Sequence, residues 1–256
     1  MKKQILLMVA LCISMAASAQ IVVSQSHSVI KMQRPYTLNF YVKAGVGVEG
    51  LMGHVDDIWA YLYPGNFHGT PQINTHRAFN LSLGIDRTIG QKGAYWAAEI
   101  GVGSRGAAMG VKEATYNEKP VTEVSTDRDA CRGTFFYGMP KIGWKFPVSN
   151  NIKIDTHLGG FFGYTAPIDE IQTFTFIDPQ TGNTKIVEDG YPNGHGWGIY
   201  DELFDAGAQI GVGVWIHQFN IDLSYRQGFT CMTHNDGLSY NVILSLGYAI
   251  PLKKRP

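Results

Sequence analysis

The chain has few charged residues and, after its first residues, no long apolar run. Only 16% of its 256 residues are charged, and 21 Lys and Arg residues balance 21 Asp and Glu residues. This balance gives no electrostatic reason to bind nucleic acid or another polyanion. No later segment approaches the roughly 18 unbroken apolar residues that a membrane helix requires. If the chain enters a membrane, it must therefore cross it with strands.

Cysteine is scarce as well, with three in the chain. Cys12 lies in an N-terminal segment that we expect to be removed, which leaves Cys131 and Cys231. An even number in an oxidising compartment permits one disulfide. We predict that Cys131 and Cys231 form it, because both fall at the outer ends of predicted strands.

The N-terminal segment has the pattern of a secretory signal peptide. Lys2 and Lys3 precede an apolar run, and the small residues Ala17, Ser18 and Ala19 follow it. We expect cleavage after Ala19, so that 1–19 is a signal peptide, 20–35 a periplasmic lead-in and 36–256 one barrel domain.

What the sequence has is glycine, aromatic residues and strands. There are 30 glycines, and 12% of the residues are aromatic. Eight runs alternate between apolar and polar residues with the period of a half-buried strand, each about eight to thirteen residues long. These runs lie at 37–49, 79–86, 96–105, 135–146, 152–164, 204–216, 219–226 and 240–250.

The connections between these runs alternate in length. Short ones lie at 88–92, 147–151 and 217–218, and long ones at 52–78, 107–133, 165–203 and 228–239. Outer-membrane barrels have short periplasmic turns and long external loops, and an even strand count returns both termini to the periplasm. Within the third long connection, QTFTFIDPQTGNTKIVE predicts a hairpin that turns near Asp178 to Asn183.

Alternation alone would also fit a soluble lipocalin-like barrel or a β-sandwich. Three features favour a membrane. The apolar faces carry no charge, aromatic residues gather near both ends of the strands, and glycines crowd the polar faces, as a narrow lumen requires. The sequence therefore predicts an all-β protein, an eight-stranded antiparallel transmembrane β-barrel with up-and-down meander topology, in the outer membrane of a Gram-negative bacterium. Pro140, in mid-strand, predicts a bulge.

Three segments resemble the PorT-like outer-membrane β-barrel domain family, namely GMPKIGWKF, DAGAQIGVGVWIHQFNIDLSYRQGF and NVILSLGYAI. The resemblance covers most of Tyr36 to Ile250. The ending departs from the family pattern, because Ile250 stands where an aromatic residue is expected and PLKKRP follows. The resemblance implies the fold and the location, and some relatives serve secretion machinery. No functional residue carries over by motif.

Twelve ionisable residues fall on the polar, inward faces. Six are basic and six acidic, so we expect them to pair into a plug that closes the lumen, because an isolated buried charge is costly. The alternative is a proton or ion path through a narrow channel for small solutes. The residues are Lys43, Glu49, Asp86, Glu99, Arg105, Lys141, Lys145, Lys153, Asp155, Asp205, Asp222 and Arg226.

Other chemistry finds little support. His217, Asp222 and Ser224 could form the triad of a lipid-modifying enzyme, but two of them sit on one strand with no oxyanion site. The loop residues His54, His68, His76, His195, His234, Asp56, Asp57 and Asp236 lack metal-ligand spacing. We therefore predict no enzyme activity, no cofactor and no metal.

The long loops are unusually aromatic, most clearly at Trp59, Tyr61, Tyr63, Trp197 and Tyr200. Such residues on a rigid scaffold favour recognition of a protein partner or a surface ligand, besides the membrane lipid around the barrel. Equally, they could pack the first and third loops together as a lid. No nucleic-acid partner is expected.

Overall fold

The computed structural model describes residues 38–53, 67–89, 93–116, 118–120, 124–126, 132–167, 172–178, 180–189, 203–231 and 237–253. Every regular element within these ranges is a β-strand. The described residues contain no helix long and apolar enough to cross a membrane.

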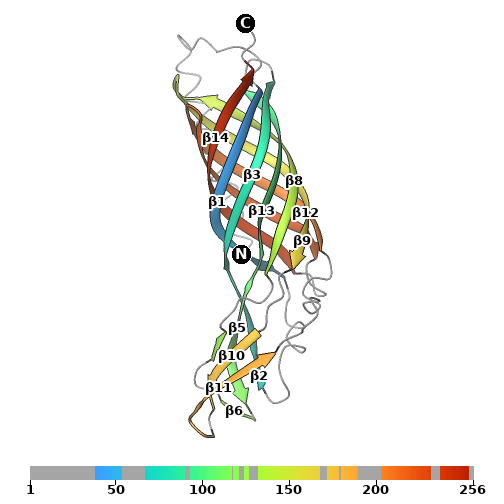
Figure 1. Ribbon diagram of the computed structural model, residues 1–256, viewed down its shortest axis with the longest axis vertical. Coiled ribbons are helices and arrows are strands. Elements are labelled where there is room, and N and C mark those ends of the chain that lie inside the picture. The colour runs from blue at the N-terminus through green and yellow to red at the C-terminus, as the bar shows by residue number, and fades with distance from the viewer. Residues whose placement is uncertain are drawn as a thin grey trace.

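Eight strands form a closed antiparallel barrel (Figure 1). Each pairs with its neighbours in barrel order, and pairing between the first and the last closes the ring. The predicted eight-stranded meander is confirmed, with strands longer than the alternating runs at most ends. They are β1 (Leu38–Met52), β3 (His76–Ile89), β4 (Ala94–Gly106), β8 (Arg132–Pro147), β9 (Ile152–Pro167), β12 (Phe204–Ile216), β13 (Phe219–Cys231) and β14 (Leu238–Lys253).

The strands alternate between an exposed apolar outer face and a buried polar inner face. On β3, alternate residues from His76 to Asp86 are buried and those between them are exposed. Large apolar side chains stand on the outside, as at Val46 (69% exposed) and Ile100 (66% exposed). A protein with water outside would place these side chains inside, so the polarity of the barrel is inverted.

Aromatic side chains inside the barrel lie against glycines of neighbouring strands. A Cβ added to Gly101 would stand 2.5 Å from the ring of Tyr137, and one added to Gly84 would stand 2.4 Å from Tyr41. Both distances are shorter than real contacts, so these rings occupy space that any other residue would fill. The inward glycines therefore make room for the rings that fill the lumen.

Pro140 lies on the outer face of β8, and the expected bulge is absent. The pairing of β8 with β9 keeps the same register on both sides of Pro140, at Gly138↔Phe162 and at Lys141↔Gly159. On its other side, Pro140 pairs in regular register with Ala98 of β4. Proline has no N–H to donate, and β8 accommodates it by losing paired positions with β9. No extra residue is inserted into the strand.

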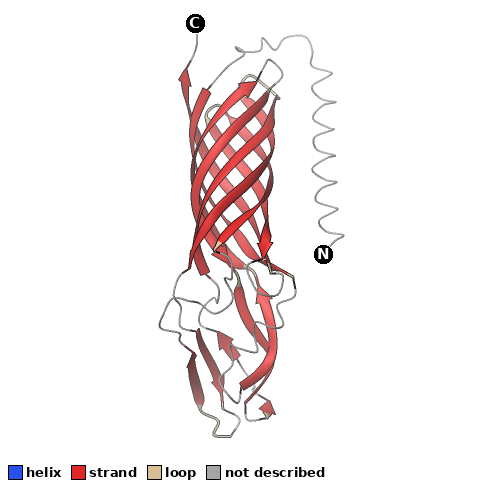
Figure 2. Cartoon of the chain, turned by 90° about the vertical axis from the view of Figure 1, so that its right-hand side faces the viewer, coloured by secondary structure: helices blue, strands red, loops and turns tan. Residues whose placement is uncertain are grey.

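Six shorter strands extend beyond one end of the barrel (Figure 2). They form two three-stranded sheets, β2–β5–β6 and β7–β10–β11. The second long connection contributes to both sheets and links the first connection to the third. The strands are β2 (Phe67–Asn74), β5 (Ala108–Tyr116), β6 (Lys119–Pro120), β7 (Val124–Thr126), β10 (Gln172–Ile177) and β11 (Thr184–Asp189).

The hairpin predicted in the third connection is confirmed as β10–β11. The amide of Asp178 donates to the carbonyl of Asn183 and that of Gly182 to the carbonyl of Asp178, each over 2.8 Å. Gly182 has a φ of 69°, a conformation that favours glycine. Turn chemistry in the sequence therefore located this hairpin.

Candidate functional site

The inside of the barrel holds the predicted charged residues, with one exception. All but Lys145 and Lys153 are buried to less than a tenth exposure, and the side chain of Lys145 is 11% exposed. Lys153 is exposed, so its predicted place in the lumen is corrected. Its position has the inward phase, but it is only the second residue of β9 and lies at the rim of the barrel.

Polar side chains meet around Glu99 and Arg226, midway along the barrel, and we call this set of contacts the middle layer. Lys141 donates to Oε2 of Glu99 over 2.6 Å, and Tyr41 donates to the same oxygen over 3.2 Å. The Tyr137 hydroxyl is 3.1 Å from Oε1. A buried carboxylate with an ammonium partner and two hydroxyls has the hydrogen bonds that burial of its charge requires.

Arg226 of β13 connects side chains of the middle layer that come from different sides of the lumen. Its guanidinium donates to Asn80 of β3 over 3.2 Å, to the Tyr137 hydroxyl of β8 over 3.0 Å and to Gln209 of β12 over 2.7 Å. β3 and β8 each lie three strands away from β13 in the barrel order. The contacts of Arg226 therefore span the full width of the lumen.

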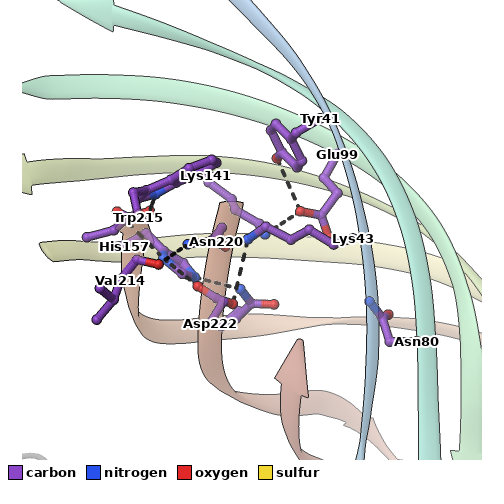
Figure 3. A network of polar contacts seen from close by, with 12 residues as sticks. Tyr41, Lys43, Asn80, Glu99, Lys141, His157, Val214, Trp215, Asn220 and Asp222 are labelled. Atoms are coloured by element: carbon purple, nitrogen blue, oxygen red, sulfur yellow. Dashed lines mark hydrogen bonds and ion pairs between the residues drawn. The ribbon is translucent and has the colours of Figure 1, made fainter. Parts of the chain in front are cut away.

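A second set of contacts surrounds His157 (Figure 3). Its Nε2 is 3.1 Å from the amide nitrogen of Gln209, and its Nδ1 is 3.6 Å from Asp222 and 4.0 Å from Asp155. Lys43 lies 3.6 Å from the other oxygen of Asp222. This set continues the middle layer toward the short turns.

On the turn side, the carboxylates of Asp86 and Asp155 are both bound by side chains from other strands. Lys145 and Asn39 each donate to Asp86 over 2.8 Å. Tyr95 and Trp215 donate to Asp155 over 2.8 and 3.0 Å, and the Lys145 ammonium lies over both of these rings. Polar contacts therefore continue on the turn side of the middle layer.

On the loop side, Arg105 and Glu49 form a further layer of polar contacts. Arg105 lies 2.8 Å from Asp205 and donates to Thr165 over 2.7 Å. Ser104 donates to Glu49 over 3.0 Å, and the Nδ1 of His76 is 3.5 Å from the same carboxylate. The loop-side layer thus joins β1, β3, β4, β9 and β12.

Sequence reasoning found the charged residues of these layers and missed the neutral ones. The missed residues share the inward phase and the burial of the charges, and that phase was the signal that could have found them. They are Tyr41, Asn80, Tyr95, Tyr137, His157, Gln209 and Trp215.

Two small cavities flank the middle layer. The turn-side cavity has a volume of about 10 Å³ and is lined by Lys43, Tyr95 and His157 among others. The loop-side cavity has a volume of about 20 Å³ and is lined by Glu49, Arg105 and Phe135 among others. Each has room for about one water molecule, which is too little for a solute.

The residues of the possible hydrolase triad are not brought together. Ser224 and Asp222 are buried inside the barrel, and Asp222 faces Lys43 and His157. His217 is exposed in the turn between β12 and β13. Among the described residues, no three His, Cys, Asp or Glu side chains are grouped to hold a metal ion.

Several predicted residues lie outside the described ranges. These are the loop aromatics Trp59, Tyr61, Tyr63, Trp197 and Tyr200, and also Cys131. Cys231 ends β13, so the disulfide between Cys131 and Cys231 stays a prediction. Counting free thiols by mass spectrometry of the non-reduced protein would test it.

Comparison with solved structures shows a likeness to small outer-membrane barrels. Ail of Yersinia pestis, in complex with the heparin analogue sucrose octasulfate, is 12% identical over 83% of this chain and 99% of that chain, with a TM-score of 0.35. Neisserial surface protein A is 10% identical over 82% and 96%, with a TM-score of 0.36. The outer-membrane protein AlkL is 11% identical over 90% and 96%, with a TM-score of 0.36. No protein-family model and no curated protein sequence matches the chain.

Proposed function

We propose that the chain is an integral protein of a bacterial outer membrane. In this proposal the barrel is a closed anchor in the membrane. The two small sheets built by the long connections, β2–β5–β6 and β7–β10–β11, form an extension, and this extension is the surface that binds a partner. The observation that carries the proposal is the combination of an apolar outside with a lumen crossed by paired charges.

The outer face of β3 supports the membrane location. Its outward row begins with Arg77 and ends near Arg87, and Phe79, Leu81, Leu83 and Ile85 stand between them. Ten residues at about 3.3 Å each span about 33 Å, and a strand tilt of about 40° reduces this to a height of about 25 Å. That height equals the apolar band of outer-membrane barrels, so the two arginines fall at its edges.

The middle layer supports the closed lumen. A solute would have to break the contacts of Arg226 with Asn80, Tyr137 and Gln209, and then pass the Lys141–Glu99 pair. Breaking one partner from a buried pair costs about 3 to 5 kcal/mol. Thermal opening of several such contacts at once is therefore rare.

The remaining parts of the proposal rest on the sequence. They are cleavage after Ala19, membership of the PorT-like family and a place in a larger assembly, such as the secretion machinery that some relatives serve. The extension suits such a role, since two sheets on a rigid barrel can hold loops in a fixed arrangement. Catalysis is not part of the proposal.

Conductance across a planar bilayer tests the closed lumen. The wild-type protein should give no stepwise conductance. A variant with Tyr137→Ala, Lys141→Ala and Arg226→Ala, which empties the middle layer, should give small steps if it folds, and this shows that the assay detects an open lumen. Steps from the wild-type protein would contradict the proposal and favour a narrow channel.

A further inference from the structure

The charged residues are sorted between the two ends of the molecule. Six of the 21 acidic residues lie in the lumen, namely Glu49, Asp86, Glu99, Asp155, Asp205 and Asp222. The other fifteen all belong to the four long connections between barrel strands, as the sequence and the strand order show. The segments at the short-turn end therefore contain no acidic residue.

The short-turn end does contain basic residues. Arg87 is exposed near the end of β3, Lys153 is exposed at the start of β9, and β14 ends at Lys253. The sequence adds Lys92 between β3 and β4, and Lys254 and Arg255 after β14. We call Arg87, Lys153 and Lys253 the basic rim.

Arg87 of the basic rim lies at the edge of the apolar band. Arg87 shares its outward row with Ile85 and Ile89, which are 37% and 53% exposed. Arg87 and Lys253 both pair in register with Leu38 of β1, so one strand separates them and their backbones lie about 10 Å apart. Basic residues beside exposed apolar ones suit the boundary between acyl chains and headgroups, where long side chains reach toward phosphates.

We propose that the basic rim binds the phosphate groups of anionic phospholipids in the leaflet at the short-turn end. This inference rests on the proposed membrane location. Each Lys or Arg near an anionic surface contributes about 1 kcal/mol, which is a factor of about five in binding. The other end of the protein, with its acidic connections, repels the same lipids, so anionic phospholipid favours one orientation of the barrel.

Tryptophan quenching tests this inference, because Trp144 lies on the outer face of β8 near the short turns and is 39% exposed. The full-length protein, with Trp59→Phe and Trp197→Phe to remove two loop tryptophans, is reconstituted in phosphatidylcholine vesicles with a minor fraction of phosphatidylglycerol. One of the two lipids carries brominated acyl chains, which quench nearby tryptophan. Brominated phosphatidylglycerol should quench at least about fivefold more effectively per molecule than brominated phosphatidylcholine.

Two variants locate the effect. Arg87→Gln, Lys153→Gln and Lys253→Gln together should abolish the preference. Lys112→Gln, Lys119→Gln and Lys185→Gln remove as many charges from the long connections and should leave it unchanged. If the first variant fails to fold, high salt added to the parent protein should abolish the preference instead.

Three results would overturn the inference. The first is equal quenching by the two lipids, which would favour an acidic protein as the partner of the basic rim. The second is a preference for phosphatidylglycerol that survives loss of the basic rim. The third is a preference that high salt leaves unchanged. Absence of quenching by either lipid would be different, because it would refute the membrane location as well.

Discussion

At the scale of single residues, the lumen depends on a few groups that many neighbours share. Glu99 of β4 binds side chains from β1 and β8 and lies 3.9 Å from the guanidinium of Arg226 on β13. Such a shared carboxylate is not equivalent to an isolated ion pair at a surface. Removing it leaves Lys141 buried without its acceptor.

Glu99→Ala should therefore destabilise the folded barrel by about 3 to 5 kcal/mol. The measurement is urea unfolding in lipid vesicles, followed by tryptophan fluorescence. Glu118→Ala, at an exposed position in a long connection, is the control and should change stability by less than about 0.5 kcal/mol. Equal effects of the two substitutions would show that the middle layer contributes nothing to stability.

Gly101→Ala should destabilise the barrel by about 1 to 3 kcal/mol, because its Cβ would meet Tyr137 at 2.5 Å and the carbonyl of Leu81 at 2.8 Å. Gly160→Ala is the matched control, since its Cβ would point outward with its nearest atom 3.7 Å away. The same unfolding experiment compares them. If both variants were as stable as the wild type, the close packing of ring on glycine would be wrong.

The alternating pattern predicted which charges face inward but not which neutral groups bind them. Phase alone assigned Glu99 and Arg226 to the lumen, because a strand has only two faces. Their contacts with Tyr137 depend on the register of strands that are distant in sequence, and one sequence does not contain that information. Lys153 shows a second limit of the alternating pattern. The pattern gives the face of a strand on which a residue lies, but not whether the residue lies at the rim of the barrel or in its interior.

At the scale of elements, each barrel strand has a charge-free outer face over its middle part. Leu244→Arg places a charge in the middle of the outer face of β14, where Leu244 is 51% exposed. This should cost about 2 to 4 kcal/mol if lipid surrounds the strand. Asn183→Arg, exposed in the turn of the β10–β11 hairpin, should cost almost nothing. If both substitutions lowered the free energy of unfolding of the vesicle-bound protein by similarly small amounts, water and not lipid would surround the outer face of the barrel.

The extension shows why some strands could be predicted and others not. β10 and β11 are neighbours in sequence, and turn residues separate them, so a local signal exists. β2 pairs with β5, which follows the whole β3–β4 hairpin, and β7 pairs with β10 of the next connection. Pairing of this kind leaves no local signal, and β2 also contains Pro71.

The hairpin can be removed as a test of separate roles. Replacing 172–189 by a short Gly-Ser turn deletes β10 and β11, and β7 loses its partner. The eight barrel strands keep all their pairing, so the variant should still migrate differently on gels when unboiled. Loss of that shift would show that the hairpin is part of the folding unit of the barrel.

At the scale of the whole molecule, the barrel joins two unlike ends. One end has short turns and basic residues, and the other has the two sheets and the acidic connections. We propose that one orientation across a membrane accounts for both the distribution of the charges and the lengths of the connections. In this proposal, the chain crosses the outer membrane with its extension outside the cell.

The most direct test places an epitope tag at each end and asks which one antibodies reach in intact cells. One tag replaces the turn at 180–182 of the β10–β11 hairpin, and the other is inserted at 149–150 between β8 and β9. The account predicts that antibody binds the hairpin tag on intact cells, and binds the turn tag only after the outer membrane is permeabilised. A hairpin tag that stays hidden until permeabilisation, or a protein recovered in the soluble periplasmic fraction, would contradict the account.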